Sequence, residues 1–105
     1  MANQPFEREE SDVATETSKE VKRPPLFKVF LHNDDYTTMD FVVFILRSIF
    51  HHSDESAFRI MMHVHTRGLG VAGLYPFETA EAKVSQVHAL AEENEYPLRC
   101  SLEPE

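Results

Sequence analysis

Residues 26–50 read LFKVFLHNDDYTTMDFVVFILRSIF and contain, in order, a predicted strand, a turn and a helix. The apolar run 26–31 is rich in aromatic and β-branched residues, which favour strands. The Asn-Asp-Asp triplet at 33–35 ends this run, because these side chains bond nearby backbone groups and favour turns. The spacing of the apolar residues that follow predicts a helix over about 38–50.

The predicted helix has a cap and a broad apolar surface. Thr37 is the expected N-cap, with Asp40 three residues later as a weak capping-box partner. Phe41, Phe44 and Ile45 fall outside the main apolar stripe, so the helix is expected to be deeply buried or to use a second face. The stripe itself consists of Met39, Val42, Val43, Leu46, Ile49 and Phe50.

The rest of the sequence predicts two further helices and two further strands. Ser53 is a good N-cap for a helix that ends at Gly68, and residues 70–75 read as a strand. Pro76 opens a third helix, and alternating apolar residues after Pro97 predict a closing strand. The order β-α-α-β-α-β, with few strands, predicts an α+β fold in which a small three-stranded antiparallel sheet packs against three helices.

Composition divides the chain near residue 24. Residues 1–24 hold six acidic and four basic residues and no sustained apolar period, which predicts a disordered N-terminal tail. Residues 25–105 have the size of a single domain. We therefore expect one folded unit preceded by a tail.

Charge and cysteine content exclude several functional classes. The net charge of −8 repels phosphate backbones and argues against nucleic acid as a partner. A single cysteine allows no internal disulfide and is typical of a reducing cytosol. Neither an apolar run of membrane-spanning length nor a signal pattern is present in the sequence, so a cytoplasmic protein without membrane contact is expected.

Signatures of catalysis and metal binding are weak. The sequence has no nucleophile elbow, Walker loop or dinucleotide-binding turn. Cys100 alternates with leucines on a predicted strand, where a small buried residue is more usual than a reactive thiolate. The histidine pairs within 51–52 and 63–65 lack both a cysteine pair and the i, i+4 spacing of a helical zinc site. We expect no catalytic residue, metal or cofactor, and keep a metal-dependent or thiol enzyme as an alternative.

A more informative pattern joins the triplet to the first two helices. If these helices flank a groove, its floor is apolar, and Asn33, an aspartate and His65 place acceptors at its rim. Such a groove suits an ammonium group attached to an apolar side chain. The alternative is that the triplet is only a turn and His65 only a core histidine. The apolar residues concerned are Met39, Val42, Met61 and Val64.

Residues 27–42 closely resemble the ClpS adaptor family, whose pattern is K-V-x-L-x-N-D-D-Y-T-P-M-E-F-V. The resemblance runs in order over about residues 24–103. Thr38 stands where the family usually has Pro, which is expected to loosen the start of the helix, and His32 stands where an aliphatic residue is common. The other matching stretches are 61–65, 80–84 and 93–100.

The resemblance implies a non-enzymatic adaptor of the bacterial N-end rule. Such adaptors bind proteins that begin with Leu, Phe, Tyr or Trp and hand them to the AAA+ unfoldase of the Clp protease. By this resemblance, Asn33, Asp34 and His65 hold the α-amino group of the substrate, while Asp35 and Thr37 shape the turn and touch the peptide backbone. The implied hydrophobic pocket is lined by Leu31, Met39, Val42, Met61, Val64 and Leu98.

The resemblance also implies a second, protein-binding surface. Tyr36, Glu78 and Lys83 match residues that dock on the N-terminal domain of a ClpA-type unfoldase. A monomer is expected. The remaining alternative is an interaction domain, similar to that of the ribosomal stalk, which docks a partner without binding amino termini.

Overall fold

The computed structural model describes residues 23–105, so nearly all of the predicted tail, residues 1–24, lies outside the described residues. The element order within them is β-α-α-β-α-β, as predicted. The elements are β3 (Leu26–His32), α2 (Met39–Ser48), α3 (Asp54–Arg67), β4 (Leu69–Pro76), α4 (Phe77–Glu93) and β5 (Arg99–Pro104).

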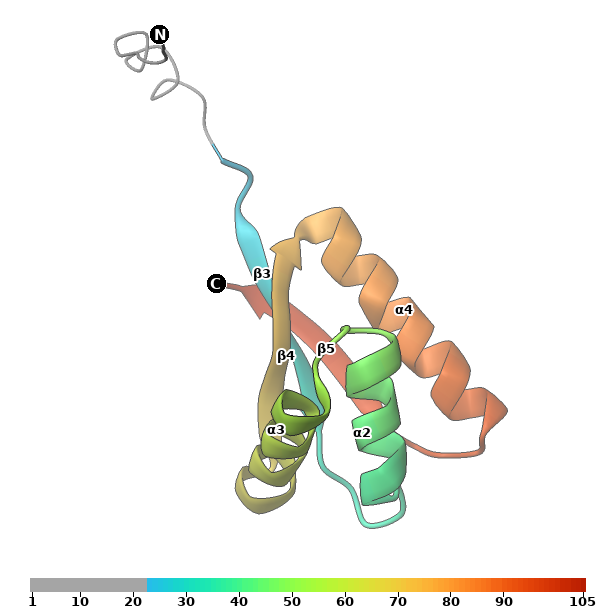
Figure 1. Ribbon diagram of the computed structural model, residues 1–105. Coiled ribbons are helices and arrows are strands. Elements are labelled where there is room, and N and C mark those ends of the chain that lie inside the picture. The colour runs from blue at the N-terminus through green and yellow to red at the C-terminus, as the bar shows by residue number, and fades with distance from the viewer. Residues whose placement is uncertain (1–22) are drawn as a thin grey trace, which may run out of the picture.

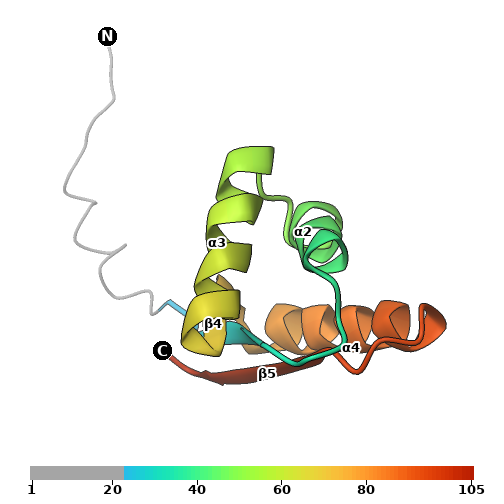
Figure 2. The ribbon, with the colours of Figure 1, turned by 90° about the horizontal axis from the view of Figure 1, so that it is seen from below.

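The sheet has the strand order β4-β3-β5, and both pairings are antiparallel. All three helices lie on the same side of this sheet (Figure 1), as the view from below also shows (Figure 2). Helices α3 and α4 contact the strands, and α2 packs beside α3. The α+β class is therefore confirmed, and the central strand β3 leads directly into the Asn-Asp-Asp triplet.

The core lies between the sheet and the helices. Val29 and Leu31 of β3 point into it and are fully buried. Helix α2 is buried on more than one side, as its composition predicted, because Phe41 and Ile45 are buried together with its main stripe. Phe44 is different, since 49% of its surface is exposed. Phe44 and Met39, which is 43% exposed, are the parts of the apolar surface of α2 that lie outside the core.

Helix α2 begins at Met39, one residue later than the predicted N-cap at Thr37 implies. Thr38 is the N-cap, and its hydroxyl accepts a hydrogen bond from the backbone N–H of Phe41 at 3.1 Å. Thr37 cannot cap the helix because its N–H and hydroxyl both donate to Asp34. The predicted capping box of Thr37 and Asp40 is therefore wrong. The loosening expected from Thr38 stays a prediction, although its side chain supplies a cap that proline lacks.

Two side-chain hydrogen bonds hold the connection between α2 and α3. The ammonium group of Lys83, on α4, donates to the backbone carbonyl of Ile49 at 2.6 Å. The register of β3 and β4 shifts at a bulge that leaves Ala72 unpaired. The ring Nε2 of His52 lies 2.6 Å from the carbonyl oxygen of this residue. These bonds fix the C-terminal end of α2 against α4 and β4.

A histidine also contacts the opposite edge of the sheet. The backbone N–H of Cys100, on β5, donates to Nε2 of His88 at 3.1 Å.

Within residues 23–105, no helix is both long enough and apolar enough to cross a membrane.

Candidate functional site

The turn between β3 and α2 is built around the carboxylate of Asp34. Its Oδ1 accepts hydrogen bonds from the backbone N–H groups of Tyr36 and Thr37, at 2.8 and 2.7 Å. Its Oδ2 accepts the hydroxyl hydrogen of Thr37 at 2.7 Å. Burial alone would raise the pKa of Asp34, but these three hydrogen bonds outweigh it and hold the pKa below its ordinary value. Asp34 is therefore ionised at neutral pH and fixes the turn.

A backbone hydrogen bond joins this turn to the end of α3. The N–H of Asn33 donates to the carbonyl oxygen of Gly68 at 2.8 Å. Gly68 has a φ of +95°, in the left-handed region that favours glycine, and its N–H closes the helix on Val64. This bond ties the triplet to the last turn of α3, in which His65 lies.

The turn, α2 and the C-terminal half of α3 enclose a cavity of about 300 Å³. The structure thus brings together every polar residue predicted for substrate binding and four of the six predicted pocket residues. The lining consists of Asn33, Asp34, Asp35, Thr37, Met39, Val42, Met61, Val64 and His65.

Two predicted pocket residues lie elsewhere. Leu31 and Leu98 are 0% and 3% exposed in the hydrophobic core and are not part of the cavity lining. The burial of Leu31 follows from strand alternation in β3, which turns its side chain toward the helices, while Leu98 lies directly before β5. Their contribution is to the core that supports the site.

The three predicted docking residues differ in their accessibility. Tyr36, beside the cavity, is 76% exposed, and Glu78 is exposed in the first turn of α4. Lys83 is instead engaged within the protein. Besides its bond to Ile49, its ammonium group lies 5.5 Å from the ring centroid of Tyr75. Its structural role is one that sequence reasoning missed.

The two aspartates of the triplet also have different roles, which sequence reasoning did not separate. Asp34 already accepts three hydrogen bonds, so it has little capacity left for a ligand. Asp35 is exposed and accepts no hydrogen bond from any residue in 23–105. The spacing of Asp34 and Thr37 was the available signal, because an aspartate often bonds backbone and hydroxyl groups two and three residues ahead.

The cavity combines an acceptor-rich rim with an apolar floor. Val42, Met61 and Val64 are buried, whereas Met39 is 43% exposed. The rim carries carboxylates, an amide and an imidazole but no Lys or Arg. A cation attached to an apolar side chain fits this arrangement, because the rim can accept its hydrogen bonds while the floor contacts the side chain.

The groups considered for catalysis show no activation. Cys100 is buried, and this burial raises the pKa of its thiol to about 12, so it is not a thiolate at neutral pH. In the part of the chain that the structure describes, no group of three or more His, Cys, Asp or Glu is placed to hold a metal ion.

Comparison with known proteins gives consistent matches over most of the chain. The family described as "ATP-dependent Clp protease adaptor protein ClpS" matches residues 22–101. The ClpS adapter protein of Desulfatibacillum aliphaticivorans is 54% identical over 94 residues, which cover 90% of each chain. That of Myxococcus xanthus is 51% identical and covers 91% of this chain and 92% of its own.

A solved structure also resembles the fold. It is Agrobacterium tumefaciens ClpS2 bound to L-phenylalaninamide, with a TM-score of 0.76 and 38% sequence identity. The match covers 79% of this chain and all of that protein.

Proposed function

The chain belongs to the ClpS family of adaptors of the ATP-dependent Clp protease, and on this premise we propose that it binds the N-terminal residue of substrate proteins and delivers them to that protease. The proposed substrates begin with Leu, Phe, Tyr or Trp. The observation that carries the proposal is the cavity between the turn, α2 and α3, with acceptors at its rim and an apolar floor. The phenylalaninamide bound by the Agrobacterium relative has the matching chemistry, an α-amino group beside an apolar side chain.

We propose that Asn33, His65 and the carboxylate of Asp35 accept the hydrogens of the substrate's α-ammonium group. Asp34 has one lone pair left on Oδ2 for the same group, but its main role is to hold the turn together with Thr37. The first side chain of the substrate then lies against Met39, Val42, Met61 and Val64.

The expected affinity is moderate. Burial of one Leu or Phe side chain contributes roughly 1.5–3 kcal/mol, and each charge-assisted hydrogen bond contributes about 1.5–3 kcal/mol. After the cost of association, a dissociation constant around micromolar, or about −8 kcal/mol, is reasonable. An adaptor must release its substrate, so such an affinity suits delivery.

Delivery requires a second surface and, we propose, the N-terminal tail. Exposed Tyr36 and Glu78 are the proposed contacts with the N-terminal domain of a ClpA-type unfoldase, and Lys83 supports that surface from within. We propose that the protein acts as a cytoplasmic monomer without catalytic activity. A shortened chain that begins at Lys22 should bind a substrate peptide and dock on the unfoldase but fail to stimulate degradation. Full degradation with the shortened chain would contradict this role of the tail.

The decisive experiment compares a Phe-Leu peptide with a free amino terminus and the same peptide after N-acetylation. Acetylation removes the charge and two of the donors, so we expect affinity to fall by roughly 100-fold or more. A domain that docks partners without reading amino termini would treat both peptides alike. An enzyme that depends on a metal or a thiol would instead lose its function on EDTA treatment or in Cys100→Ala.

A further inference from the structure

A second cavity, of about 400 Å³, lies at the other end of α2 and shares no residue with the first. We call it the α2 C-terminal hollow. Its size is within the range of ligand sites. None of its lining residues is acidic, although the chain has 18 acidic against 10 basic residues. The lining consists of Phe44, Arg47, Ser48, His51 and His52.

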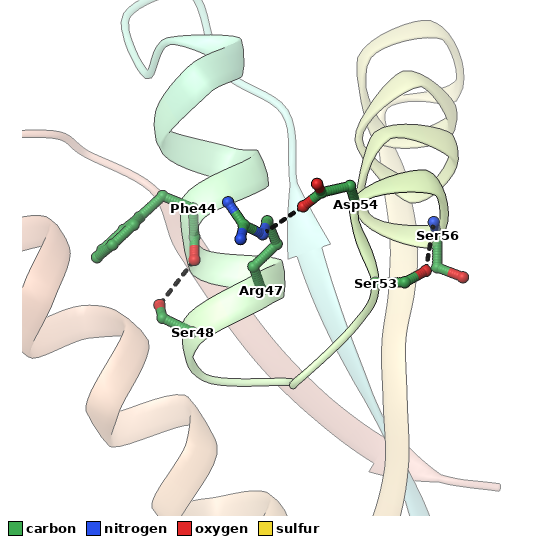
Figure 3. A network of polar contacts seen from close by, with 6 residues as sticks. All are labelled: Phe44, Arg47, Ser48, Ser53, Asp54 and Ser56. Atoms are coloured by element: carbon green, nitrogen blue, oxygen red, sulfur yellow. Dashed lines mark hydrogen bonds and ion pairs between the residues drawn. The ribbon is translucent and has the colours of Figure 1, made fainter.

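The apolar part of the hollow is the ring of Phe44. Nearly half of this side chain is exposed, and its nearest aromatic neighbour, Phe41, has its ring centroid 6.1 Å away. The hydroxyl of Ser48 donates to the backbone carbonyl of Phe44 at 2.7 Å, so this hydroxyl hydrogen is already paired (Figure 3). The hollow therefore offers an aromatic surface that the fold itself does not need.

The permanent cation of the hollow is Arg47. Its Nε donates to Oδ1 of Asp54 at 2.7 Å, across the gap between α2 and α3. Its two terminal nitrogens have no acceptor among residues 23–105, and Figure 3 shows them on the side of the guanidinium that faces away from Asp54. These nitrogens carry four N–H donors in a plane, the geometry that binds a carboxylate through two parallel hydrogen bonds.

Two imidazoles complete the hollow. Because the carbonyl of Ala72 can only accept, Nε2 of His52 must donate to it, which fixes the ring and leaves Nδ1 available. His51 is exposed and has a φ of 61°, a left-handed conformation that is uncommon for residues other than glycine. Neither ring adds negative charge, and both become cationic on protonation.

We propose that the α2 C-terminal hollow binds an acidic segment of a partner protein in which a large apolar side chain stands next to Glu or Asp residues. A carboxylate of the segment pairs with the terminal nitrogens of Arg47, and the apolar side chain lies on the ring of Phe44. The chemistry is opposite to that of the first cavity, which takes a cation. This proposal does not depend on the proposed function, because it requires no free amino terminus.

The test uses the full chain and a peptide that the first cavity cannot hold, acetyl-Phe-Glu-Glu-Glu-amide. Titration followed by two-dimensional amide NMR should shift the signals of residues 44–52 and leave those of 33–39 unchanged. Arg47→Gln and Phe44→Ser should each weaken binding about tenfold. Arg47→Lys should restore only part of the affinity, since a lysine cannot pair with both carboxylate oxygens in one plane.

The controls separate a specific site from general charge attraction and from misfolding. Acetyl-Phe-Gln-Gln-Gln-amide should bind about tenfold more weakly than the acidic peptide. Arg99→Gln, which removes an exposed cation outside the hollow, should not change binding. Each variant should keep the dispersed amide NMR spectrum of the unchanged chain outside residues 44–52, which shows that it is folded.

Several results would overturn the proposal. They are the absence of shifts at 44–52, equal binding of the uncharged peptide, or unchanged affinity in Arg47→Gln. Self-association that sedimentation detects and Phe44→Ser abolishes, without peptide binding, would assign the hollow to a second copy of the chain.

Discussion

The two ends of α2 carry cavities of opposite chemistry. At the N-terminal end, the carboxylate of Asp34 accepts three hydrogen bonds within the turn, while that of Asp35 remains free to accept hydrogen bonds from a ligand. At the C-terminal end, Asp54 pairs only with the Nε of Arg47, and the terminal nitrogens of Arg47 remain free to donate hydrogen bonds. In both places the charge of the cavity follows from the polar atoms that the fold leaves unpaired.

The helix dipole favours this placement of charge. Acids near a helix N-terminus and bases near its C-terminus each contribute about 0.3–1 kcal/mol. Helix α2 has Asp40 in its first turn and Arg47 in its last. Arg47, which stabilises the helix, thus also biases its C-terminal end toward anionic ligands, whereas Asp40 lies outside the lining of the first cavity. The helix is about 15 Å long, so the two preferences are separated by a few residues of an extended peptide.

The largest loss of ligand affinity should follow from removing the free carboxylate at the N-terminal end. Asp35→Asn removes the proposed charged acceptor without touching the bonds of the turn, so affinity for a Phe-Leu peptide should fall roughly 10- to 100-fold. Fluorescence titration measures the loss, and Asp40→Asn, also acidic and nearby, should change little. If Asp34→Asn loses more affinity than Asp35→Asn at unchanged stability, Asp34 and not Asp35 makes the main contact with the ammonium group.

The next effect concerns which side chains the cavity admits. Met39 lines the cavity at its exposed side, where an extra methyl on the Cβ of the ligand would collide with it. Peptides that begin with Ile or Val should bind at least about tenfold more weakly than Leu peptides. Met39→Ala should admit them, whereas Met62→Ala, outside the cavity, should not. Equal dissociation constants for Leu and Ile peptides in the unchanged chain would disprove this role.

The affinity of the N-terminal cavity for its peptide should change several-fold with pH. A neutral imidazole at position 65 can accept a hydrogen from the ammonium group, but a protonated one can only donate and carries a like charge. Affinity for a Phe peptide should therefore fall on mild acidification, measured between about pH 7.5 and 5.5. His65→Ala should start weak and vary little, while His63→Ala, outside the cavity, should follow the unchanged chain. If the affinity of the unchanged chain does not vary with pH, His65 has a structural role and does not contact the ammonium group.

The smallest effect should be on stability, through Asp34. Its pKa is lower in the folded state than in the unfolded state, so its contribution is present above the ordinary pKa of aspartate and lost as pH falls through the folded value. Asp34→Ala should lower the free energy of unfolding by about 1–2 kcal/mol at pH 7. Urea unfolding at about pH 3 should show a smaller difference. An equal deficit at both pH values would mean that the carboxylate charge does not stabilise the turn.

The sequence allowed the fold and most of the first cavity to be predicted because both follow local rules. Apolar periodicity placed the helices, and the caps at Ser53 and Gly68 are confirmed. Leu31 was assigned to the cavity although strand alternation turns it into the core. The N-cap of α2 was misplaced because Thr37 and Thr38 are equivalent by propensity. Only the competing bond to Asp34 decides between them.

The C-terminal end of α2 was less predictable because its contacts join residues far apart in sequence. Nothing local indicates that Lys83 bonds the carbonyl of Ile49, 34 residues away. The bond from His52 to Ala72 depends on a bulge that only the strand register creates. The sequence places Phe44 outside the apolar stripe, with Arg47 three residues later on the same helix, but His51 and His52 meet them only through the loop after α2.

His52 and His88, which bond backbone groups of the outer strands β4 and β5, bear on how the protein avoids self-aggregation. Free strand edges invite pairing with other chains, and each imidazole occupies one backbone group at such an edge. The ring of His52 donates to β4 and can do so whether or not it is protonated. The ring of His88 accepts from β5, which only the neutral form can do. Loss of the His88 ring would therefore free a backbone donor on β5, from which strand-to-strand aggregates could grow.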